Sequence, residues 1–444
     1  MNKRAIAAVI LAAGHGTRMK SATPKVLHAI GGRSMLAHVM AAAAELSPAR
    51  LSVVIGSQAP EVGDAARAIR PDAAIAVQDP PRGTGDAARK AAPALDGFSG
   101  SVLVLYADTP LVRAATLKTL VAKVEDGAAV AVLAFRPADP GAYGRLKIDA
   151  FGALEAIVEA KDATADELKM NFVNSGVMAV EASFLARALP QLKDDNAKKE
   201  FYLTDIVAIA RREGLACAVA EADADEVAGV NSRAELSEAE AIFQRRARLA
   251  AMEAGVTLID PATVFFSWDT KLANDVVIEP NVFLGPGVEI ASGALVRAFS
   301  HIEGARIGEN ASVGPFARLR PGAMLARETK VGNFVEIKNA QLGAGAKVPH
   351  LTYVGDASVG AGANIGAGTI TCNYDGFSKH RTEIGAGAFI GSNSSLVAPV
   401  KVGDGAYVGS GSVITKDVEA DSLAVARGRQ TAFHGWAARF RAAN

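Results

Sequence analysis

The chain has 444 residues with 47 basic and 47 acidic side chains, so its formal net charge is zero. A chain of this length exceeds one ordinary hydrophobic core, and we expect two or three domains. The balanced charge removes the bulk electrostatic argument for a nucleic-acid or acidic membrane partner. The two cysteines, Cys217 and Cys372, lack metal-ligand spacing. They argue against a disulfide framework or a structural zinc and fit a reducing, cytoplasmic compartment.

The N-terminal apolar run, residues 5–13, admits two interpretations. After Asn2-Lys3-Arg4 it has the form of a short signal peptide with a small-residue cleavage site. It could equally be a buried first strand. The sequence that follows, residues 14–19, favours the strand, because a glycine turn after a strand can hold phosphate oxygens. No other apolar run is long enough to span a bilayer, so we expect no membrane insertion.

The first 230 residues alternate apolar runs with Ala-rich helical stretches, which predicts a Rossmann-like α/β domain. Strands are expected at 5–11, 51–55, 101–106 and 129–135, and a helix at 34–45. The first turn does not have the Gly-x-Gly-x-x-Gly spacing, because Met19 occupies the last place, and it is not a Walker A loop. A dinucleotide dehydrogenase and a P-loop enzyme are therefore poor fits.

Two basic residues beyond the turn, Arg18 and Lys25, could neutralise a triphosphate and its leaving group. The alternative is that both are solvated surface charges. The run Leu11-Ala-Ala-Gly-x-Gly-Thr-Arg-Met19, followed by Pro24-Lys-Val-Leu27, resembles the signature of sugar-1-phosphate nucleotidyltransferases.

Further elements follow in the order that this family requires. Gln78 and the Gly83-Thr84 turn resemble its uracil-reading segment, and the positions that match Gly144, Glu159 and Asn174 hold the sugar in the family. Asp108 ends an apolar strand, where it could be a plain turn residue or helix cap. At the carboxyl edge of a parallel sheet, its hard oxygen also suits Mg²⁺. The resemblance implies that Asp108 and Asn231 hold Mg²⁺. It further implies that UTP and the UDP-sugar product contact Leu11, Ala12, Ala13, Gly14, Lys25, Gln78, Gly83, Thr84, Tyr106, Ala107, Asp108, Gly144, Glu159, Asn174 and Asn231.

A single linker helix is predicted over 232–254, with a Ser start, no internal Gly or Pro, and Gly255 as a stop. We expect it to be an arm rather than a site, with Arg245, Arg246 and Arg248 on a solvated face. The predicted domains are therefore residues 1–231, the linker helix 232–254, and residues 255–444.

The C-terminal half carries an aliphatic residue about every sixth position. These residues are Ile278, Leu284, Ile290, Val296, Ile302, Ile307, Val313, Leu319, Leu325, Val331, Ile337, Leu342, Val348, Val354, Val359, Ile365, Ile384, Ile390, Leu396, Val402, Val408 and Ile414. The period predicts a hexapeptide β-solenoid, with three short strands in each lap and the aliphatic side chain inside. An ordinary sandwich is disfavoured because its strands alternate with period 2.

A solenoid can be an inert spacer, so its interruptions are more informative than its repeats. The repeat breaks between Thr371 and Glu383 for a polar and aromatic loop. His350 stands where the repeat has no need for imidazole. It could be a plain surface histidine, but histidine is also suited to take a proton from an attacking amine. Arg320 and Lys338 could grip a sugar phosphate.

Three motifs carry a close resemblance over nearly the full length: Phe316-Ala-Arg-Leu-Arg-Pro-Gly322, His350-Leu-Thr-Tyr353 and the segment 364–376. They resemble the bacterial family of bifunctional enzymes that acetylate glucosamine-1-phosphate and then uridylylate the product to UDP-N-acetylglucosamine. That product is a precursor of peptidoglycan and lipopolysaccharide. The resemblance implies a left-handed parallel β-helix, acetyl-CoA and UTP as cosubstrates, and a homotrimer whose interfaces build the acetyltransferase site.

The resemblance also assigns roles in the solenoid. His350 is expected to be the general base, and Lys379 is a further basic candidate. Glucosamine-1-phosphate is expected to contact Arg320, Lys338, Tyr353 and Asn364. Acetyl-CoA is expected to contact Ala367, Asn373, Tyr374, Ser392, Ser410 and Arg427.

Four positions depart from the family pattern: His15, Ala107, Ala160 and Ser410. Ala107 stands where the family has Gly, and its methyl group could crowd the substrate or alter the backbone torsion. Two other functions stay open. One is a nucleotidyltransferase for another sugar or base with a purely structural solenoid, and the other is a non-catalytic assembly subunit.

Overall fold

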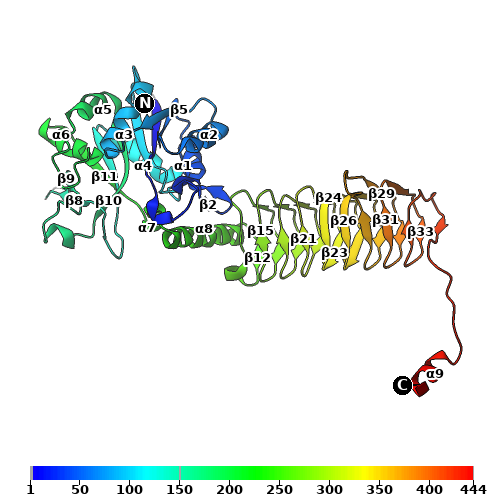
Figure 1. The fold of residues 1–444 in the computed structure, drawn as a ribbon. Coiled ribbons are helices and arrows are strands. Elements are labelled where there is room, and N and C mark those ends of the chain that lie inside the picture. Colours follow the sequence, from blue (N-terminus) through cyan, green and yellow to red (C-terminus); the bar gives the residue numbers. More distant parts are fainter. Residues whose placement is uncertain (1–3, 150–151, 444) are drawn as a thin grey trace. The chain divides into compact units, whose positions relative to one another are not determined.

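The computed structural model describes residues 4–149 and 152–443. The chain forms two compact units, one ending at Phe243 and one beginning at Gln244 (Figure 1). Within the described residues, no helix is both long and apolar enough to cross a membrane.

The first unit is built on a mixed sheet with strand order β11-β7-β10-β6-β1-β4-β5. β1, β4, β5 and β6 run parallel, while β10 is antiparallel to β6 and β7. The strands are β1 (Ile6–Ala12), β4 (Arg50–Gly56), β5 (Ala74–Gln78), β6 (Ser101–Tyr106), β7 (Val130–Phe135), β10 (Val173–Glu181) and β11 (Cys217–Glu221), with β8 (Arg145–Ile148) and β9 (Leu154–Val158) extending from β10. The apolar N-terminal run is thus the buried first strand that we expected.

Side chains on β1 alternate between two hydrophobic cores, as the pleat of a strand requires. Ala8 and Ile10 join the core beneath α1, α2 and α4, whereas Ala7 and Val9 join the core beneath α3, α5 and α6. The helices are α1 (Met35–Ala44), α2 (Pro60–Ile69), α3 (Thr84–Ala91), α4 (Ala114–Glu125), α5 (Ala182–Ala188), α6 (Ile206–Arg212) and α7 (Ala224–Val227). The sheet is therefore covered on both faces (Figure 1).

Short elements complete this unit. A two-stranded ribbon joins β2 (Ala29–Ile30) to β3 (Arg33–Ser34). The 3-10 turns are η1 (Thr17–Met19), η2 (Lys25–Leu27), η3 (Ala92–Leu95), η4 (Glu167–Lys169), η5 (Leu189–Gln191) and η6 (Leu203–Asp205).

Helix α8 (Arg233–Glu253) occupies the position of the predicted linker helix. Its first half packs through Leu236, Ala239 and Phe243 in the first unit. In its second half, Gln244 makes two hydrogen bonds to the Phe266 backbone, of 2.7 and 2.8 Å. The chain therefore divides inside the helix. Arg248 does not lie on a solvated face, because it donates to the Val264 carbonyl at 2.8 Å and packs over the Phe265 ring.

The second unit is a parallel β-helix whose three faces are stacks of short strands (Figure 1). The first face contains β12 (Thr257–Leu258), β14 (Val277–Ile278), β17 (Leu295–Val296), β20 (Ser312–Val313), β23 (Lys330–Asn333), β25 (Lys347–His350), β27 (Asn364–Ile365), β30 (Phe389–Ile390), β33 (Tyr407–Val408) and β35 (Leu423–Ala424). The coil before it includes η7 (Pro261–Thr263).

The other two faces share two long strands, β24 (Glu336–Leu342) and β26 (Tyr353–Val359), which bend from one face to the next. The second face contains β15 (Phe283–Leu284), β18 (His301–Ile302), β21 (Arg318–Leu319), the starts of β24 and β26, β28 (Ile370–Cys372), β31 (Ser395–Val397) and β34 (Val413–Ile414). The third face contains β13 (Lys271–Leu272), β16 (Glu289–Ile290), β19 (Arg306–Ile307), β22 (Met324–Leu325), the ends of β24 and β26, β29 (Thr382–Ile384) and β32 (Val400–Val402).

The predicted aliphatic repeat forms the core of this prism, since every one of its residues from Ile278 to Ile414 is at most 4% exposed. The structure also fills the apparent break in the repeat. Thr371 takes the inward position there at 1% exposure, and its hydroxyl accepts from the Gly355 amide at 2.8 Å. The prism begins at Thr257, earlier than the first predicted repeat residue.

One edge of the prism, where the first face turns into the second, carries an apolar ridge formed by Phe299, Phe316, Phe334 and Leu351. All four are in the left-handed region, with φ between 50° and 59°. Such a conformation costs a non-glycine residue about 1–3 kcal/mol. The three phenylalanine rings stack with centroid separations of 5.0 and 5.2 Å, yet each of the four side chains is 46–62% exposed.

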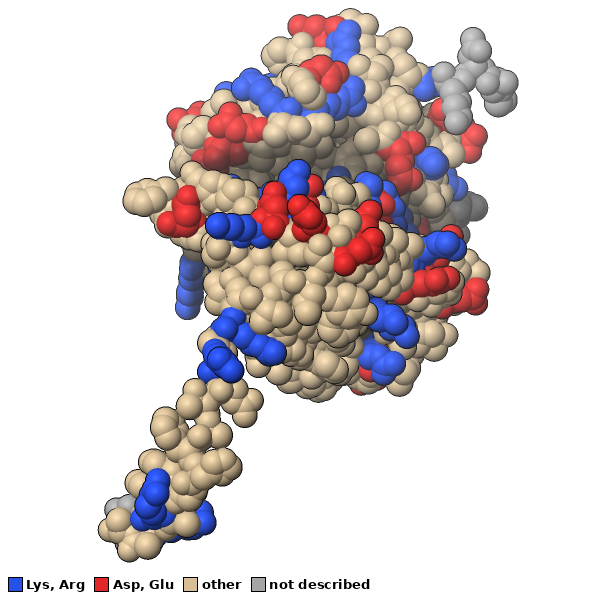
Figure 2. Space-filling view, turned by 90° about the vertical axis from the view of Figure 1, so that its right-hand side faces the viewer, with Lys and Arg blue, Asp and Glu red and all other residues tan. Residues whose placement is uncertain are grey.

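The last helix, α9 (Trp436–Ala443), follows an exposed segment. Residues 422–444 contain four arginines and no acidic residue. Elsewhere on the face shown in Figure 2, basic and acidic side chains are interspersed, in keeping with the net charge of zero.

Candidate active sites

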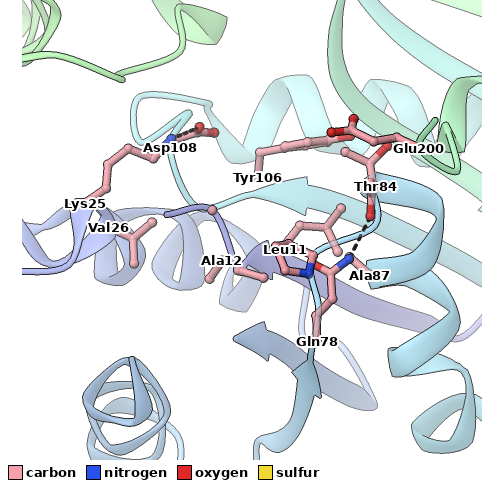
Figure 3. Close-up of a pocket in the computed structure, with 14 residues that line it drawn as sticks. Leu11, Ala12, Lys25, Val26, Gln78, Thr84, Ala87, Tyr106, Asp108 and Glu200 are labelled. Carbon is pink, nitrogen blue, oxygen red and sulfur yellow. Dashed lines mark hydrogen bonds and ion pairs between the residues drawn. The ribbon is translucent and has the colours of Figure 1, made fainter. Parts of the chain in front are cut away.

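The first unit contains a pocket of about 260 Å³ at the carboxyl ends of its parallel strands. This is where ligands bind in open α/β sheets. The pocket is lined by Leu11, Ala12, Ala13, Gly14, Lys25, Val26, Gln78, Pro81, Gly83, Thr84, Ala87, Tyr106, Asp108 and Glu200. Figure 3 shows Lys25 and Asp108 at one end, Gln78 and Thr84 at the other, and Tyr106 between them.

Lys25 is the focus of the first end. It stands on η2, is only 8% exposed, and its ammonium nitrogen lies 2.5 Å from Asp108 Oδ2 and 2.9 Å from Asn231 Oδ1. The glycine loop lies directly against it, because a Cβ built on Gly16 would approach Lys25 Cβ to 2.6 Å. Gly16 has φ of +60°, so glycine is needed here for both space and torsion.

The oxygens of the two predicted metal ligands, Asp108 and Asn231, converge on this one cationic nitrogen. A carboxylate and an amide oxygen suit Mg²⁺, which binds few protein groups and takes its other ligands from water and phosphates. The described residues contain no group of three or more His, Cys, Asp or Glu side chains that could hold a metal. The donor set therefore fits a hard cation shared with a phosphate ligand.

The other end of the pocket holds the predicted uracil-binding segment. Gln78, at the end of β5, donates through Nε2 to the Gly83 carbonyl and to Asp86 Oδ2, both at 2.9 Å. Its side-chain carbonyl is thereby oriented. Gly83 has φ of +102°, and a Cβ there would lie 2.6 Å from the Phe201 carbonyl. Thr84 follows as the first residue of α3.

The predicted sugar-binding residues gather nearby. The backbone N–H of Asn174 donates to the Gly144 carbonyl at 2.8 Å, and a Cβ on Gly144 would lie 3.5 Å from Glu159 Oε1. Thr204 donates its hydroxyl to the same Glu159 oxygen at 3.1 Å. Burial raises the pKa of the Glu159 carboxyl, and Thr204 opposes that shift. The structure thus brings Gly144, Glu159 and Asn174 together.

Two N-terminal candidates stand apart from the pocket lining. Arg18 lies exposed on η1. Ala107 is fully buried, contributes its methyl group to the hydrophobic core, and donates its amide to the Leu11 carbonyl at 3.0 Å. Its methyl group therefore does not face the pocket. Of the other departures, His15 Nδ1 lies 3.0 Å from Gln58 Nε2.

His350 ends β25 at the same edge of the prism as the apolar ridge. Its ring nitrogen Nδ1 lies 2.5 Å from Asn333 Oδ1 on the preceding coil. Its carbonyl accepts from the Thr352 hydroxyl at 2.7 Å and from the Gly368 amide at 3.2 Å. Hydrogen bonds thus hold both the backbone and the exposed ring of His350.

The predicted acetyl-CoA contacts continue this edge on later coils. The Asn393 amide donates to the Ala367 carbonyl and the Gly411 amide donates to the Ser392 carbonyl, each at 2.8 Å. Arg427 donates to the Ser410 carbonyl at 2.7 Å. One edge of the prism therefore carries His350, Ala367, Ser392, Ser410 and Arg427. On these later coils the small residues Ala367, Ser392 and Ser410 take the place of the large apolar residues of the ridge.

The second face carries three of the four predicted glucosamine-1-phosphate contacts: Arg320, Lys338 and Tyr353. Glu336 accepts from Arg320 at 2.8 Å and pairs in register with Tyr353. The neighbouring Lys379 ammonium lowers the pKa of Lys338. The fourth candidate, Asn364, lies on the first face beside Ile365.

The loop of residues 373–381 closes over this face. The Asn373 amide nitrogen is shared between the Tyr353 hydroxyl, at 3.4 Å, and Asp356 Oδ2. Asn339 donates to Asp356 Oδ1 at 2.6 Å. Burial favours the neutral acid, but these hydrogen bonds hold the pKa of Asp356 below its ordinary value. Tyr374 is exposed, and its hydroxyl donates to the Gly376 carbonyl at 2.5 Å.

Several residues in these sites were missed by the sequence analysis: Asn333, Glu336, Asn339 and Asp356. The available signal was the length of a coil, because Asn333 precedes His350 by 17 residues and Asn339 precedes Asp356 by 17. Polar residues one coil apart stack directly upon each other in this fold.

Comparison with known proteins agrees with both units. Residues 8–173 match the MobA-like NTP transferase domain, and residues 381–416 match the bacterial transferase hexapeptide (six repeats). The fold class is therefore the predicted one, a Rossmann-like nucleotidyltransferase domain followed by a left-handed parallel β-helix of hexapeptide repeats. Fold and sites together define a two-domain transferase.

Similarity over the whole length narrows this class. The chain is 58% identical to "Bifunctional protein GlmU" of Azorhizobium caulinodans, covering 100% of this chain and 99% of that protein. It is 57% identical to the protein of that name from Sphingopyxis alaskensis, covering 98% and 96%. The chain belongs to the bifunctional GlmU family and is a bifunctional enzyme.

A solved inositol-1-phosphate CTP transferase from T. maritima is also similar. It is 16% identical and covers 54% of this chain and 95% of that one, with a TM-score of 0.43, too low to add to the argument.

Proposed function

We propose that the β-helix unit transfers an acetyl group from acetyl-CoA to the amine of glucosamine-1-phosphate. The N-terminal unit then transfers the uridylyl group of UTP to the acetylated sugar phosphate, giving UDP-N-acetylglucosamine and pyrophosphate. The observation that carries the proposal is the presence of two separate constellations, Lys25 with Asp108 and Asn231 in one unit and the His350 edge in the other. Both cosubstrates are cytoplasmic metabolites, which supports a cytoplasmic location.

In the acetyl transfer, His350 acts as the general base. It takes a proton from the sugar amine as the amine nitrogen attacks the thioester carbonyl, and the CoA thiolate leaves. A positioned base of this kind contributes about 10²- to 10⁴-fold to a rate. Arg320, Lys338 and Lys379 bind the sugar phosphate. A phosphate dianion between Lys338 and Lys379 would relieve the repulsion that lowers the Lys338 pKa.

In the uridylyl transfer, an oxygen of the sugar phosphate attacks the α-phosphorus of UTP and pyrophosphate leaves. No covalent enzyme intermediate is needed, because positioning and neutralisation of charge account for such transfers. Lys25, which lines the pocket, and Arg18, which is exposed outside its lining, would neutralise the phosphates. Asp108 and Asn231 would hold Mg²⁺, which supplies Lewis-acid stabilisation of the phosphate charge.

The base end of the same pocket would select uracil. Gln78, Gly83 and Thr84 lie there with their backbone and side chains fixed by hydrogen bonds. Gly144, Glu159 and Asn174 would hold the N-acetylated sugar, since they present both donors and acceptors.

We further propose that the enzyme is a homotrimer joined through the apolar ridge. Four strained residues expose 46–62% of their side chains along one line, an arrangement that a second copy of the chain would bury. The ridge stops at Leu351, beside His350, and small residues continue the line. A neighbouring chain packed on the ridge would therefore leave a groove beside Ala367, Ser392 and Ser410 for acetyl-CoA.

The test is an assay of the purified protein with glucosamine-1-phosphate, acetyl-CoA, UTP and Mg²⁺, in which CoA thiol and pyrophosphate are followed separately. We expect CoA release without UTP, and pyrophosphate release only when acetylated sugar phosphate is present. Pyrophosphate without any CoA release would reduce the β-helix to a scaffold. Release of neither CoA nor pyrophosphate would indicate a non-catalytic subunit.

A further inference from the structure

Asn333, on the coil that precedes the proposed base, makes a direct side-chain contact with His350. Asn333 ends β23, and β23 pairs with β25 so that Asn333 lies in register with His350. The Asn333 amide oxygen is 2.5 Å from His350 Nδ1. The backbones approach closely here, because a Cβ built on Gly332 would lie only 1.8 Å from the Pro349 carbonyl oxygen. Glycine at position 332 thus permits the contact.

The direction of this hydrogen bond follows from its chemistry. An amide oxygen can only accept, so Nδ1 of His350 donates its hydrogen and Nε2 keeps its lone pair. Which ring nitrogen of a histidine is free is set by the hydrogen bond that the other makes. Without an acceptor at position 333, either nitrogen could carry the hydrogen, and the exposed ring could rotate about its χ angles.

We propose that Asn333 is a positioning residue of the acetyl transfer, holding His350 in the Nδ1–H tautomer with Nε2 directed at the sugar amine. The inference rests on the proposed role of His350 as the base. The backbone of His350 is already fixed by Thr352 and Gly368, so the Asn333 contact restricts the ring itself.

The test compares Asn333→Leu, which keeps the approximate shape and removes the acceptor, with Asn333→Asp, which keeps an acceptor oxygen. CoA release is measured with both substrates varied. For Asn333→Leu we expect kcat to fall about 10- to 100-fold, a part of what a general base contributes, with both KM values changed less than twofold. Asn333→Asp should retain most of kcat. Gln341→Leu, an exposed amide on the third face, serves as the matched control.

A double-mutant cycle separates positioning from folding. In a His350→Ala background, Asn333→Leu should cost nothing further, because there is no ring left to position. Unchanged kcat in Asn333→Leu, an equal loss in Asn333→Asp, or an additive loss in the His350→Ala background would each overturn the inference. If Asn333→Leu does not fold by thermal melting, Asn333→Ala takes its place in the same cycle. An inactive wild type or a fully active His350→Ala would instead refute the proposed function.

Discussion

The Lys25 ammonium bridges Asp108 and Asn231, residues 83 and 206 positions further along the chain, at 2.5 and 2.9 Å. Three separate segments meet at that nitrogen: η2, the turn after β6, and the residues just before α8. The Lys25–Asp108 ion pair is partly buried. Removing one partner of a buried ion pair costs more stability than removing one partner of a surface pair. Lys25 therefore joins these segments at one end of the pocket, where we propose that the phosphates bind, and brings a positive charge to that end.

Replacing Asp108 should separate the two activities. In Asp108→Asn the proposed metal ligand loses its charge, and we expect pyrophosphate release to fall at least about 100-fold. CoA release should be unchanged, since Asp108 lies in the other unit. Both products are measured from one preparation, so each reaction is the folding control for the other. Parallel loss of both in a folded variant would contradict the two-site arrangement.

Removal of metal should have the same selectivity. EDTA is expected to stop pyrophosphate release and spare CoA release, because the proposed acetyl transfer uses His350 as a base and no Lewis acid. Adding excess Mg²⁺ should restore the lost activity. A CoA-release rate that falls with chelation would show that the β-helix site also needs a metal.

A charge on the apolar ridge should disrupt assembly. Phe334→Glu places a carboxylate in the middle of the stacked rings, where an interface would have to desolvate it. We expect light scattering to show monomers, CoA release to fall sharply, and pyrophosphate release to persist. Leu249→Glu, at an exposed apolar position on α8, is the control. If the Phe334→Glu enzyme is still a trimer, the subunit interface does not involve the apolar ridge.

The acidic residues beside the sugar-binding group predict a pH effect on stability. Burial, with repulsion from Glu159, Asp195 and Asp162, raises the pKa of Asp205 to about 6 from 3.8. The folded state therefore binds more protons between these values, and stability falls as pH rises through this window. The cost is fully present above pH 6 and absent below about pH 4.

Asp205→Asn should accordingly raise the melting temperature of the first unit at pH 8, by an amount corresponding to roughly 1–2 kcal/mol, because solvent screens a partly exposed carboxylate and reduces the effect of the full shift. The gain should shrink as the pH falls from 6 to 4. Asp166→Asn, which removes an exposed carboxylate of the same unit, is the control. A gain that is constant over this pH range would show that the charge of Asp205 is not the cause.

The architecture was largely predictable because both units obey local periodicity. The six-residue repeat fixed which residues face inward, since each lap is built from neighbours in sequence. Between Ile278 and Ile414 the repeat did not predict Thr371, a polar residue that fills an inward position and accepts a hydrogen bond from the Gly355 amide. The predicted domain start at residue 255 lies close to the start of the prism at Thr257, but the repeat itself was recognised only from Ile278, because the first coil contains a 3-10 turn in place of regular repeats.

The sites were harder to predict, because their geometry depends on contacts between distant segments. Motifs identified Lys25, Asp108 and His350, and the structure places each among polar partners. They also suggested Arg18, which lies outside the pocket lining, and a crowding effect of Ala107, whose methyl group is in the core. Position in a motif does not say which way a side chain points.

The loop of residues 373–381 turns the same corner of the prism that residues 398 and 399 turn one coil later. The strands on either side keep their pairing, Ile370 with Ser395 and Thr382 with Val400. The length of this loop therefore does not alter the pairing of the strands on either side of it. A loop at such a corner can therefore change in length and chemistry while the coils that carry it keep their structure.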